Sequence, residues 1–416
     1  MRILISGASV AGPVLAYWLT RHGFTPTVVE KAPTLRKTGG HAVDLFGPAL
    51  DVAARMGLGE QIQANKTGVD QLTLLREGNT RPVQVELARV FTAVADHHLE
   101  IMRDDLSEIF YDATRDDVEY VFGDSITSVT PHGDVTFEHG EPRTFDLVIG
   151  ADGLHSNVRR LVFGAESEFS TFLGAYVAVA SVPNYLQLDN ELILHAGVGR
   201  TAGIYRARHM DDAQAVFLFR NATPLNYHHH DIPRQKQLLR EAYTGAGWEV
   251  PRLLAELDQT PAFYFDSITQ LQMRTWSRGR VSLVGDAGYC PGPAVGGSTS
   301  LAVVGAYVLA GALAQANGDP VSGFRAYEQE MGDYVRGSRS FACGTAKRLI
   351  PNSRPGLWAL ANGVRLVLHL PLGVTSALTR LNGKAVRPHD SITLRDYSRC
   401  EHTATGSKPS PPPGSH

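Results

Sequence analysis

Several apolar runs of this chain are short and end at a glycine or an acidic residue. Ile3–Ser6 stops at Gly7, and Thr27–Val29 stops at Glu30. Runs of this length between turn residues are typical of buried strands in a parallel sheet. The sequence between the two runs, up to about His22, predicts a connecting helix. Residues 1–30 therefore predict a βαβ unit.

Two later runs repeat this pattern. Phe145–Ile149 leads into a turn that contains Asp152-Gly153, and Val281–Val284 leads into Gly285-Asp286. A Pro/Gly-rich loop follows the second run, and an apolar helix is expected from about Ser298. Acidic side chains at the carboxyl ends of parallel strands lie where such sheets bind ligands. The two ends of the chain therefore predict one shared site for a polar cofactor.

The pattern changes between residues 170 and 270. Segments 175–180 and 215–219 are rich in β-branched and aromatic residues, and loops with Asn, Asp and Pro separate them. These features are typical of an antiparallel sheet. We expect a separate lobe that covers a substrate site above the cofactor.

Composition narrows the class of protein. The 416 residues are 43% hydrophobic and 19% charged, as in an ordinary soluble enzyme, and the net charge of −3 gives no reason to expect nucleic acid or an anionic membrane as a partner. Cys290, Cys343 and Cys400 are far apart, which disfavours a disulfide framework or a zinc site and favours the cytoplasm. The stretch 364–378 is too short and interrupted to span a bilayer.

His228-His229-His230 is a possible metal-binding run. Successive side chains point in different directions, and no second ligand cluster is evident. We therefore expect a solvated loop and no metal site.

The turn from Gly7 to Gly12 has the spacing of a dinucleotide fingerprint, with Ser9 in place of its middle glycine. A helix N-terminus after such a turn offers N–H groups to a pyrophosphate. Glu30, next to Lys31, stands where a carboxylate would bind ribose hydroxyls. This arrangement favours FAD or an NAD-like dinucleotide over NADP.

Together these motifs resemble the single-component flavin-dependent aromatic hydroxylases, the para-hydroxybenzoate hydroxylase class, over roughly residues 1–340. Arg103 begins an Arg-x-x-Leu segment like that of the family. Arg36 and the segment from Gly39 to Asp44 are similar to the tetracycline-inactivating subgroup. The chain departs from the family pattern at Gly288-Tyr289, where Ala-His is usual, and at Ser298 and Ser300.

The resemblance implies an α/β fold with a Rossmann-like FAD-binding domain, an inserted antiparallel-sheet substrate domain and a C-terminal helical extension. The implied FAD-binding domain comprises residues 1–72, 98–168 and 275–340. The substrate domain comprises 73–97 and 169–274, the C-terminal helices 341–402, and a disordered tail 403–416. The residues expected to bind non-covalent FAD are Gly7, Ser9, Ala11, Gly12, Glu30, Lys31, Arg36, Asp44, Arg103, Asp152, Asp286, Pro293, Gly296, Gly297, Ser298 and Thr299.

The resemblance also implies an activity. NADPH or NADH would reduce FAD as a transient reductant, and O2 would form a flavin C4a-hydroperoxide that hydroxylates an aromatic or polycyclic substrate. His195, Tyr205 and Tyr264 are candidate bases, none of them preferred, so the catalytic residue stays unassigned. The aromatic side chains expected to suit a polycyclic ligand are Phe169, Phe172, Tyr176, Tyr205, Phe217, Phe219 and Phe263.

A flavin reductase, a halogenase and a flavoprotein that sequesters a ligand are alternative functions on the same fold. The Trp-x-Trp-x-Ile-Pro motif of the halogenases is absent from the sequence. We expect a cytoplasmic monomer or weak homodimer that binds neither nucleic acid nor membrane.

Overall fold

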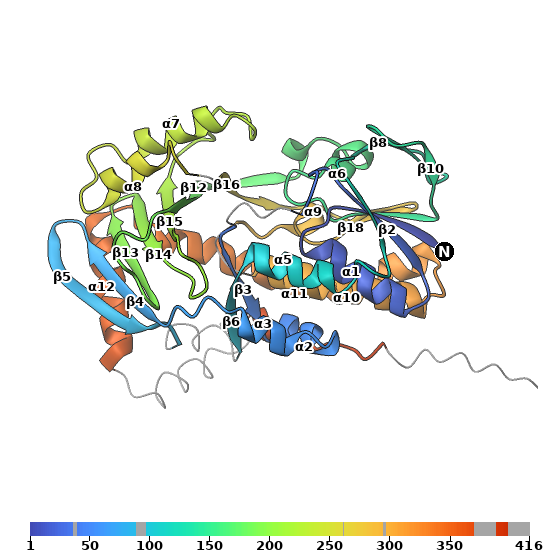
Figure 1. Ribbon diagram of the computed structural model, residues 1–416, viewed down its shortest axis with the longest axis horizontal. Coiled ribbons are helices and arrows are strands. Elements are labelled where there is room, and N and C mark those ends of the chain that lie inside the picture. Colours follow the sequence, from blue (N-terminus) through green and yellow to red (C-terminus); the bar gives the residue numbers. More distant parts are fainter. Residues whose placement is uncertain (36–39, 89–96, 261, 294–296, 370–387, 398–416) are drawn as a thin grey trace, which may run out of the picture.

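The computed structural model describes residues 1–35, 40–88, 97–260, 262–293, 297–369 and 388–397. Two lobes lie side by side, and the long helix α11 (Pro320–Leu349) extends along both of them (Figure 1). The predicted α/β class is confirmed. A parallel sheet with helices forms one lobe, and a larger, mostly antiparallel sheet forms the other.

The first sheet has the strand order β17-β18-β11-β1-β2-β7. Its central strands are parallel, and only the edge pair of β17 and β18 is antiparallel. The apolar runs of the sequence form its buried centre, since Ile3, Leu4, Ile5 and Leu147 are fully buried. The strands are β1 (Arg2–Ser6), β2 (Thr25–Glu30), β7 (Glu119–Phe122), β11 (Leu147–Gly150), β17 (Ser277–Arg278) and β18 (Val281–Leu283).

Helices α1 (Ala11–Arg21) and α10 (Ser298–Gln315) belong to the core of this lobe. Among the described residues, α10 is the one helix long and apolar enough to cross a membrane, but 78% of it is buried inside the protein. Its all-round apolar surface is therefore explained by burial in the core. Other elements of the lobe are α2 (Gly47–Arg55), α3 (Gly59–Ala64), α5 (Arg103–Asp112), α6 (Asn157–Val162), η1 (Glu166–Glu168), α9 (Asp286–Tyr289), β8 (Ile126–Val129), β9 (Asp134–Phe137) and β10 (Arg143–Thr144).

The second sheet has the order β16-β12-β15-β14-β13-β4-β5. It departs from the expected antiparallel arrangement at one pair, because β4 runs parallel to β13. The two are far apart in sequence, so no hairpin constrains their direction. The strands are β4 (Gln71–Arg76), β5 (Asn79–Glu86), β12 (Ser170–Val182), β13 (Glu191–Gly197), β14 (Arg200–Tyr205), β15 (Ala213–Arg220) and β16 (Phe263–Leu271).

The two faces of this sheet have different neighbours. Helices α7 (Ile232–Ala242) and α8 (Val250–Glu256) cover one face through Leu238, Leu239 and Leu253. The opposite face packs against Ala342 and Ala346 of α11. Because side chains alternate along a strand, neighbouring residues of one strand serve different cores.

Helix α11 continues past residue 340, where a boundary was expected, and α12 (Arg354–His369) follows it. The short helix η3 (Pro388–Asp390) and the residues up to 397 then return to the first lobe, beside α2 and α10. The expected tail 403–416 lies outside the described residues.

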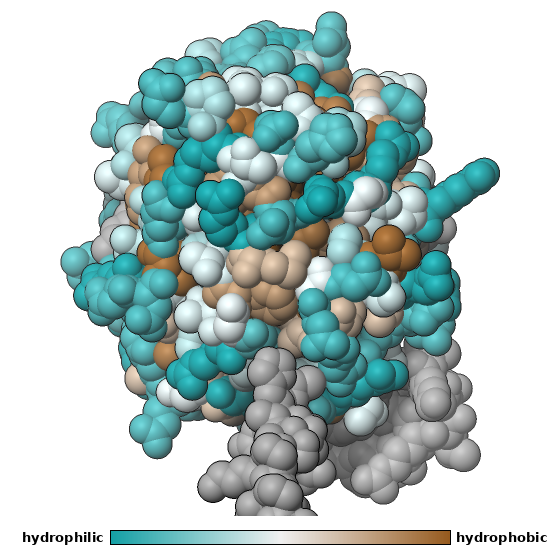
Figure 2. Space-filling model, turned by 90° about the vertical axis from the view of Figure 1, so that its right-hand side faces the viewer, coloured by the Kyte–Doolittle hydropathy of each residue, from teal (hydrophilic) through white to brown (hydrophobic). Residues whose placement is uncertain are grey.

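The end of the molecule in Figure 2 is mainly hydrophilic, with small brown areas separated by teal side chains.

Candidate cofactor site

The turn after β1 is built for close backbone approach. Gly7 has a φ of 109°, and a Cβ on it would lie 2.5 Å from the carbonyl oxygen of Ala151. A Cβ on Gly12 would lie 1.9 Å from the carbonyl oxygen of Gly7. No described side chain caps the start of α1, which begins at Ala11. Its first N–H groups can therefore bind an anionic ligand.

Glu30 folds back onto this turn. Its Oε2 accepts a hydrogen bond from the amide of Ala8 at 2.9 Å, and its Oε1 accepts one from Ala32, also at 2.9 Å. The neighbouring Lys31 is exposed. The structure thus brings the acidic end of β2 to the glycine turn, as the fingerprint predicts.

Arg103 reaches the same turn from α5. Its Nη2 donates to Ser9 Oγ at 3.0 Å, and Ser9 Oγ lies 3.2 Å from Ser107 Oγ. Ser9 stands in place of the middle glycine of the fingerprint. The structure gives it a partner on another helix, a contact that the local motif does not reveal.

Asp152 holds the turn that follows β11. Its Oδ2 accepts from the amides of Asn157 and Val158 at 2.9 and 3.0 Å, at the start of α6. Burial raises the pKa of this carboxyl, while the hydrogen bond from Ser156 and those from the amides lower it. Asp152 therefore shapes the backbone opposite Gly7.

Asp286 lies at the start of α9, directly after Gly285, whose φ is 67°. Its Oδ1 accepts a hydrogen bond from the hydroxyl of Ser298, the first residue of α10. Burial raises the pKa of Asp286, and the hydrogen bonds from Ser298 and Cys290 and the charge of Arg103 lower it. The carboxylate, the guanidinium and the N-terminus of α10 thus form one polar cluster.

The strand β3 (Ala42–Phe46), paired with β6 (His98–Met102), borders the start of α10. Ser300 Oγ accepts from the amide of Phe46 at 3.0 Å and donates to the carbonyl of Asp44 at 3.2 Å. The Asp44 carboxylate lies 2.7 Å from His98 Nε2. Ser300, the second serine departure, therefore attaches α10 to the strand that carries Asp44.

Glu100 lies opposite Asp44 on β6. Burial and the charge of Asp44 raise the pKa of Glu100 to about 7, although the Thr67 hydrogen bond and His98 oppose this. Burial beside Asp44 thus favours the protonated, neutral form of Glu100 on the β3–β6 ribbon.

The N-terminus of α10 is the second helix start at the site. Gly297, its N-cap residue, has a φ of 89°, and no described side chain caps the helix. Ser298 and Thr299 form its first turn, and Pro293 precedes it. The predicted residues Arg36 and Gly296 lie outside the described residues.

Tyr289 faces away from this site, into the protein core. Tyr327 donates to its hydroxyl at 2.9 Å, and its ring packs on Trp276 at 4.6 Å. A Cβ on Gly305 would lie 2.0 Å from the Tyr289 hydroxyl. The Gly288-Tyr289 departure therefore changes the packing of α10 and leaves the polar cluster as it is.

The three candidate bases lie in different places. His195 stacks on Trp248 at 5.5 Å. The hydroxyl of Tyr205 accepts from the amide of Ala42 at 2.8 Å. Tyr264 lies 5.1 Å from the ring of His41 and donates to Asp266 at 3.4 Å. Only Tyr205 and Tyr264 thus contact the segment that contains β3.

The aromatic side chains expected at the substrate site lie mostly elsewhere. Phe172, Tyr176, Phe217, Phe219 and Phe263 belong to the core beneath α7 and α8. They therefore contribute to the stability of the sheet and give no information on the ligand. Sequence periodicity separates the two faces of a strand but does not tell which face meets the cofactor lobe.

His228, His229 and His230 gather rather than diverge, since their ligand atoms all lie within 4.8 Å of one another. All three are exposed, and His228 Nδ1 accepts from the amide of His230 at 3.2 Å. That bond leaves the proton of neutral His228 on Nε2, which does not suit metal ligation. The expectation of a solvated loop stays a prediction.

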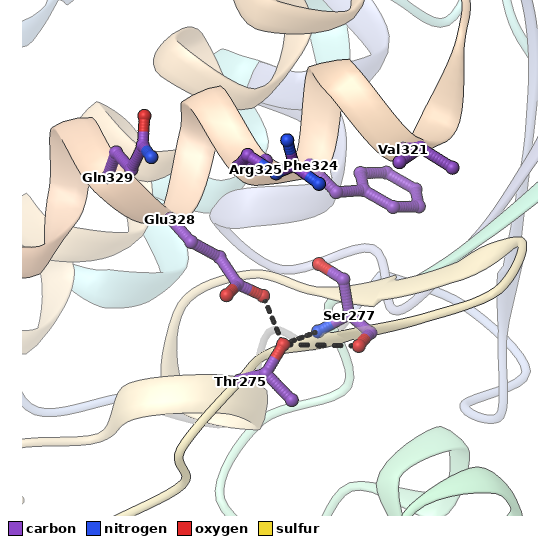
Figure 3. A pocket seen from close by; sticks show the side chains of 7 residues that line it. All are labelled: Thr275, Ser277, Val321, Phe324, Arg325, Glu328 and Gln329. Carbon is purple, nitrogen blue, oxygen red and sulfur yellow. Dashed lines mark hydrogen bonds between the residues drawn. The ribbon is translucent and has the colours of Figure 1, made fainter.

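A surface cavity of about 450 Å³ lies between α11 and the segment of Thr275 and Ser277 (Figure 3). Glu328 of α11 points toward Thr275 and accepts from its hydroxyl at 2.7 Å. The described residues that line the cavity are Thr275, Ser277, Val321, Phe324, Arg325, Glu328 and Gln329, and none of these is a predicted cofactor residue.

Known proteins are similar to this chain along most of its length. Residues 1–336 match the family described as FAD binding domain. A flavin-dependent monooxygenase from an unknown prokaryotic organism is 40% identical over 343 residues, covering 82% of this chain and 88% of that protein. One from Legionella longbeachae is 38% identical over 344 residues, covering 82% and 87%.

A solved structure has the same fold over most of this chain. The crystal structure of tetracycline destructase Tet(55) is 36% identical, covers 95% of this chain and 98% of its own, and superposes with a TM-score of 0.79. The site suits the pyrophosphate and the polar flavin edge of FAD, because it has two uncapped helix starts, the guanidinium of Arg103 and no Cβ at Gly7. The chain therefore belongs to the FAD-binding-domain family and is a flavin-dependent monooxygenase.

Proposed function

We propose that the protein uses NAD(P)H and O2 to add one oxygen atom to an aromatic or polycyclic substrate. One NAD(P)H, one proton, one O2 and the substrate would give NAD(P)+, water and the hydroxylated product. The observation that carries this proposal is the assembly of Glu30, Arg103 and Asp286 around the N-termini of α1 and α10.

In this proposal FAD supplies the redox chemistry, and the chain binds and orients it. The start of α1, with Gly7 and Gly12, would hold the pyrophosphate, and Glu30 the ribose. Arg103 and Asp286 would bind the phosphate and ribityl region. The other residues proposed to contact FAD are Ser9, Ala11, Lys31, Asp44, Asp152, Pro293, Gly297, Ser298 and Thr299. Arg36 and Gly296 are also predicted to contact FAD, but they lie outside the described residues.

The start of α10 would face the pyrimidine edge of the flavin. Its N-terminus carries partial positive charge, which stabilises negative charge on a nearby group. This arrangement is fixed before reaction by the hydrogen bonds of Ser298 and Ser300, so no reorganisation is needed when charge develops.

The proposed substrate class is a polycyclic, phenol-like compound of the antibiotic type. Support comes from the tetracycline destructases Tet(55) and Tet(51), which are 36% and 33% identical in structure comparison and superpose with TM-scores of 0.79 and 0.78. The sheet face beside β3 is largely apolar, with Leu192, Val216 and Tyr205 near Ala42 and Met102. An apolar surface with a few polar groups suits such a ligand.

The test is oxidation of NADH or NADPH by the purified, flavin-loaded protein with tetracyclines, rifamycins, anthraquinones and simple phenols. A product that gains one oxygen atom in the mass spectrum supports the proposal. Substrate-independent oxidation that yields only hydrogen peroxide would assign a flavin reductase. Tight ligand binding without oxidation would assign a ligand-sequestering flavoprotein. The cytoplasmic location and the monomeric or weakly dimeric state stay predictions.

A further inference from the structure

His389 is a fully buried histidine supplied by the C-terminal segment. It belongs to η3 and lies beyond residues 1–336, which match the family. Its ring stacks on Phe46 at 4.0 Å with an interplanar angle of 8°, and the ring of Phe341 meets it edge-on at 4.8 Å. The imidazole is therefore held between β3 and α11.

Among the described residues, neither ring nitrogen of His389 has a hydrogen-bond partner. Buried polar atoms are nearly always paired, because an unpaired donor or acceptor loses its water without replacement. An apolar residue of similar shape would stabilise this position in the absence of a ligand. A buried polar ring whose two nitrogens are both unpaired therefore indicates a ligand that forms hydrogen bonds with them when it binds.

The imidazole lies against the N-terminus of α10. A Cβ on Gly297 would be 2.5 Å from His389 Cε1 and 2.9 Å from Nδ1. The 18-residue helix starts with Gly297 as N-cap residue, and no described side chain caps it. Unpaired backbone donors and an unpaired imidazole thus meet at one place, which suits a ligand that carries both acceptors and donors.

We propose that His389 is a cofactor-binding residue, whose imidazole hydrogen-bonds the pyrimidine edge of FAD at the start of α10. This inference rests on the proposed placement of the flavin at that helix. A neutral imidazole has one donor and one acceptor. The pyrimidine edge has carbonyl oxygens and an N–H, so the two are complementary.

The surroundings keep the imidazole neutral. Burial lowers the pKa of His389 to about 4, with Asp44 raising it and His98 lowering it. A neutral ring can both donate and accept at physiological pH, whereas an imidazolium could only donate.

Backbone hydrogen bonds hold the segment that carries His389. Tyr334 of α11 donates to the His389 carbonyl at 3.3 Å. Further along, the Arg395 carbonyl accepts from Tyr307 at 2.7 Å and from Arg55 Nη1 at 2.9 Å. The segment from 388 to 397 is thus anchored to α2, α10 and α11, and His389 is presented on a rigid support.

The test compares His389→Phe with wild type in FAD affinity, flavin reduction potential and stability of the FAD-free protein. Phenylalanine keeps the stacking on Phe46 and removes both nitrogens. We expect roughly 3- to 10-fold weaker FAD binding, as for one lost hydrogen bond. The reduction potential should fall, and the Tm of the FAD-free protein should stay equal or rise. The matched control is His22→Phe, because His22 Nε2 is also buried and unpaired but lies at the end of α1.

Unchanged FAD affinity and potential in His389→Phe would overturn the inference, as would equal losses of affinity in both variants. A fall in the Tm of the FAD-free protein with unchanged FAD affinity would assign His389 to packing alone. If His389→Phe does not fold, His389→Gln, which keeps a donor and an acceptor, should retain FAD affinity. Failure of the wild-type protein to bind FAD would instead refute the proposed function.

Discussion

The guanidinium of Arg103 donates to the hydroxyl of Ser9 over 3.0 Å, which joins the first residue of α5 to the turn between β1 and α1. A glycine at position 9 would restore the usual fingerprint but remove this bond. We expect Ser9→Gly to weaken FAD binding by roughly 3- to 10-fold, because Arg103 loses its partner. Fluorescence titration with FAD measures the effect. Ser107→Ala is the control, since it removes the neighbouring hydroxyl but keeps this pair; tighter binding in Ser9→Gly would refute the assignment.

Removal of the Asp286 carboxylate should have a larger effect. Asp286→Ala should lower FAD affinity by about 1.5–3 kcal/mol for each charge-assisted hydrogen bond that is lost, and the purified protein should be nearly colourless. The flavin-to-protein absorbance ratio gives the occupancy. Asp319→Ala is a suitable control, because Asp319 caps α11 through Ser322 and should affect stability alone. Equal flavin occupancy in Asp286→Ala and wild type would contradict the proposed role.

Tyr289 and Gly305 should depend on each other. Gly305→Ala should destabilise the protein by about 1–3 kcal/mol, since the added Cβ overlaps the Tyr289 hydroxyl. Tyr289→Phe removes that hydroxyl and should recover part of the loss in the double variant. Chemical denaturation of the four proteins gives the coupling energy. Additive effects would show that the two side chains do not compete for one space.

His155 connects the two lobes and should make stability depend on pH. Its ring lies 3.1 Å from Glu166 and 3.3 Å from Asp266. Burial lowers the pKa of His155, but the hydrogen bonds to Asp266 and Glu166 outweigh it and raise the pKa to about 10. The folded-state pKa exceeds the usual 6.5, so this stabilisation is complete below about pH 6.5 and is lost as the pH rises toward 10.

Denaturant unfolding between pH 6 and 10 measures this effect. His155→Gln should flatten the decline of stability with rising pH, whereas His132→Gln, at an exposed position, should leave it unchanged. An unchanged pH dependence in His155→Gln would show that the imidazole is not charged in the folded protein.

Short-range features of this protein could be predicted from sequence. Some features depend on a few neighbouring residues, so local patterns reveal them. These are the turn at Gly7, the acidic strand ends at Glu30 and Asp286, and the helix after Ser298. His389 contacts Phe46 and Gly297, which are both distant from it in the sequence, and no local pattern encodes these contacts. The hydrogen-bond partners of Ser9 and Ser300 escaped prediction for the same reason, since they lie on other elements.

The second lobe shows a different limit. The alternation of side chains along a strand correctly places Phe217 and Val216 on opposite faces of the sheet. Because both residues are apolar, it does not tell which of the two faces each one occupies. The choice depends on which helices reach the sheet from elsewhere in the chain. His195, Tyr205 and Tyr264 were equivalent candidates for this reason, and only the structure distinguishes them.

The parallel pairing of β4 with β13 has a consequence for biosynthesis. Gln71 of β4 meets Glu191 of β13, so the hairpin of β4 and β5 leaves the ribosome long before its partner strand exists. At a rate of protein synthesis of about 5–20 residues per second, the edge of β4 that pairs with β13 stays unpaired for on the order of ten seconds. An unpaired strand edge invites pairing with other chains. We therefore expect the early hairpin of β4 and β5 to need protection from such pairing while the chain grows.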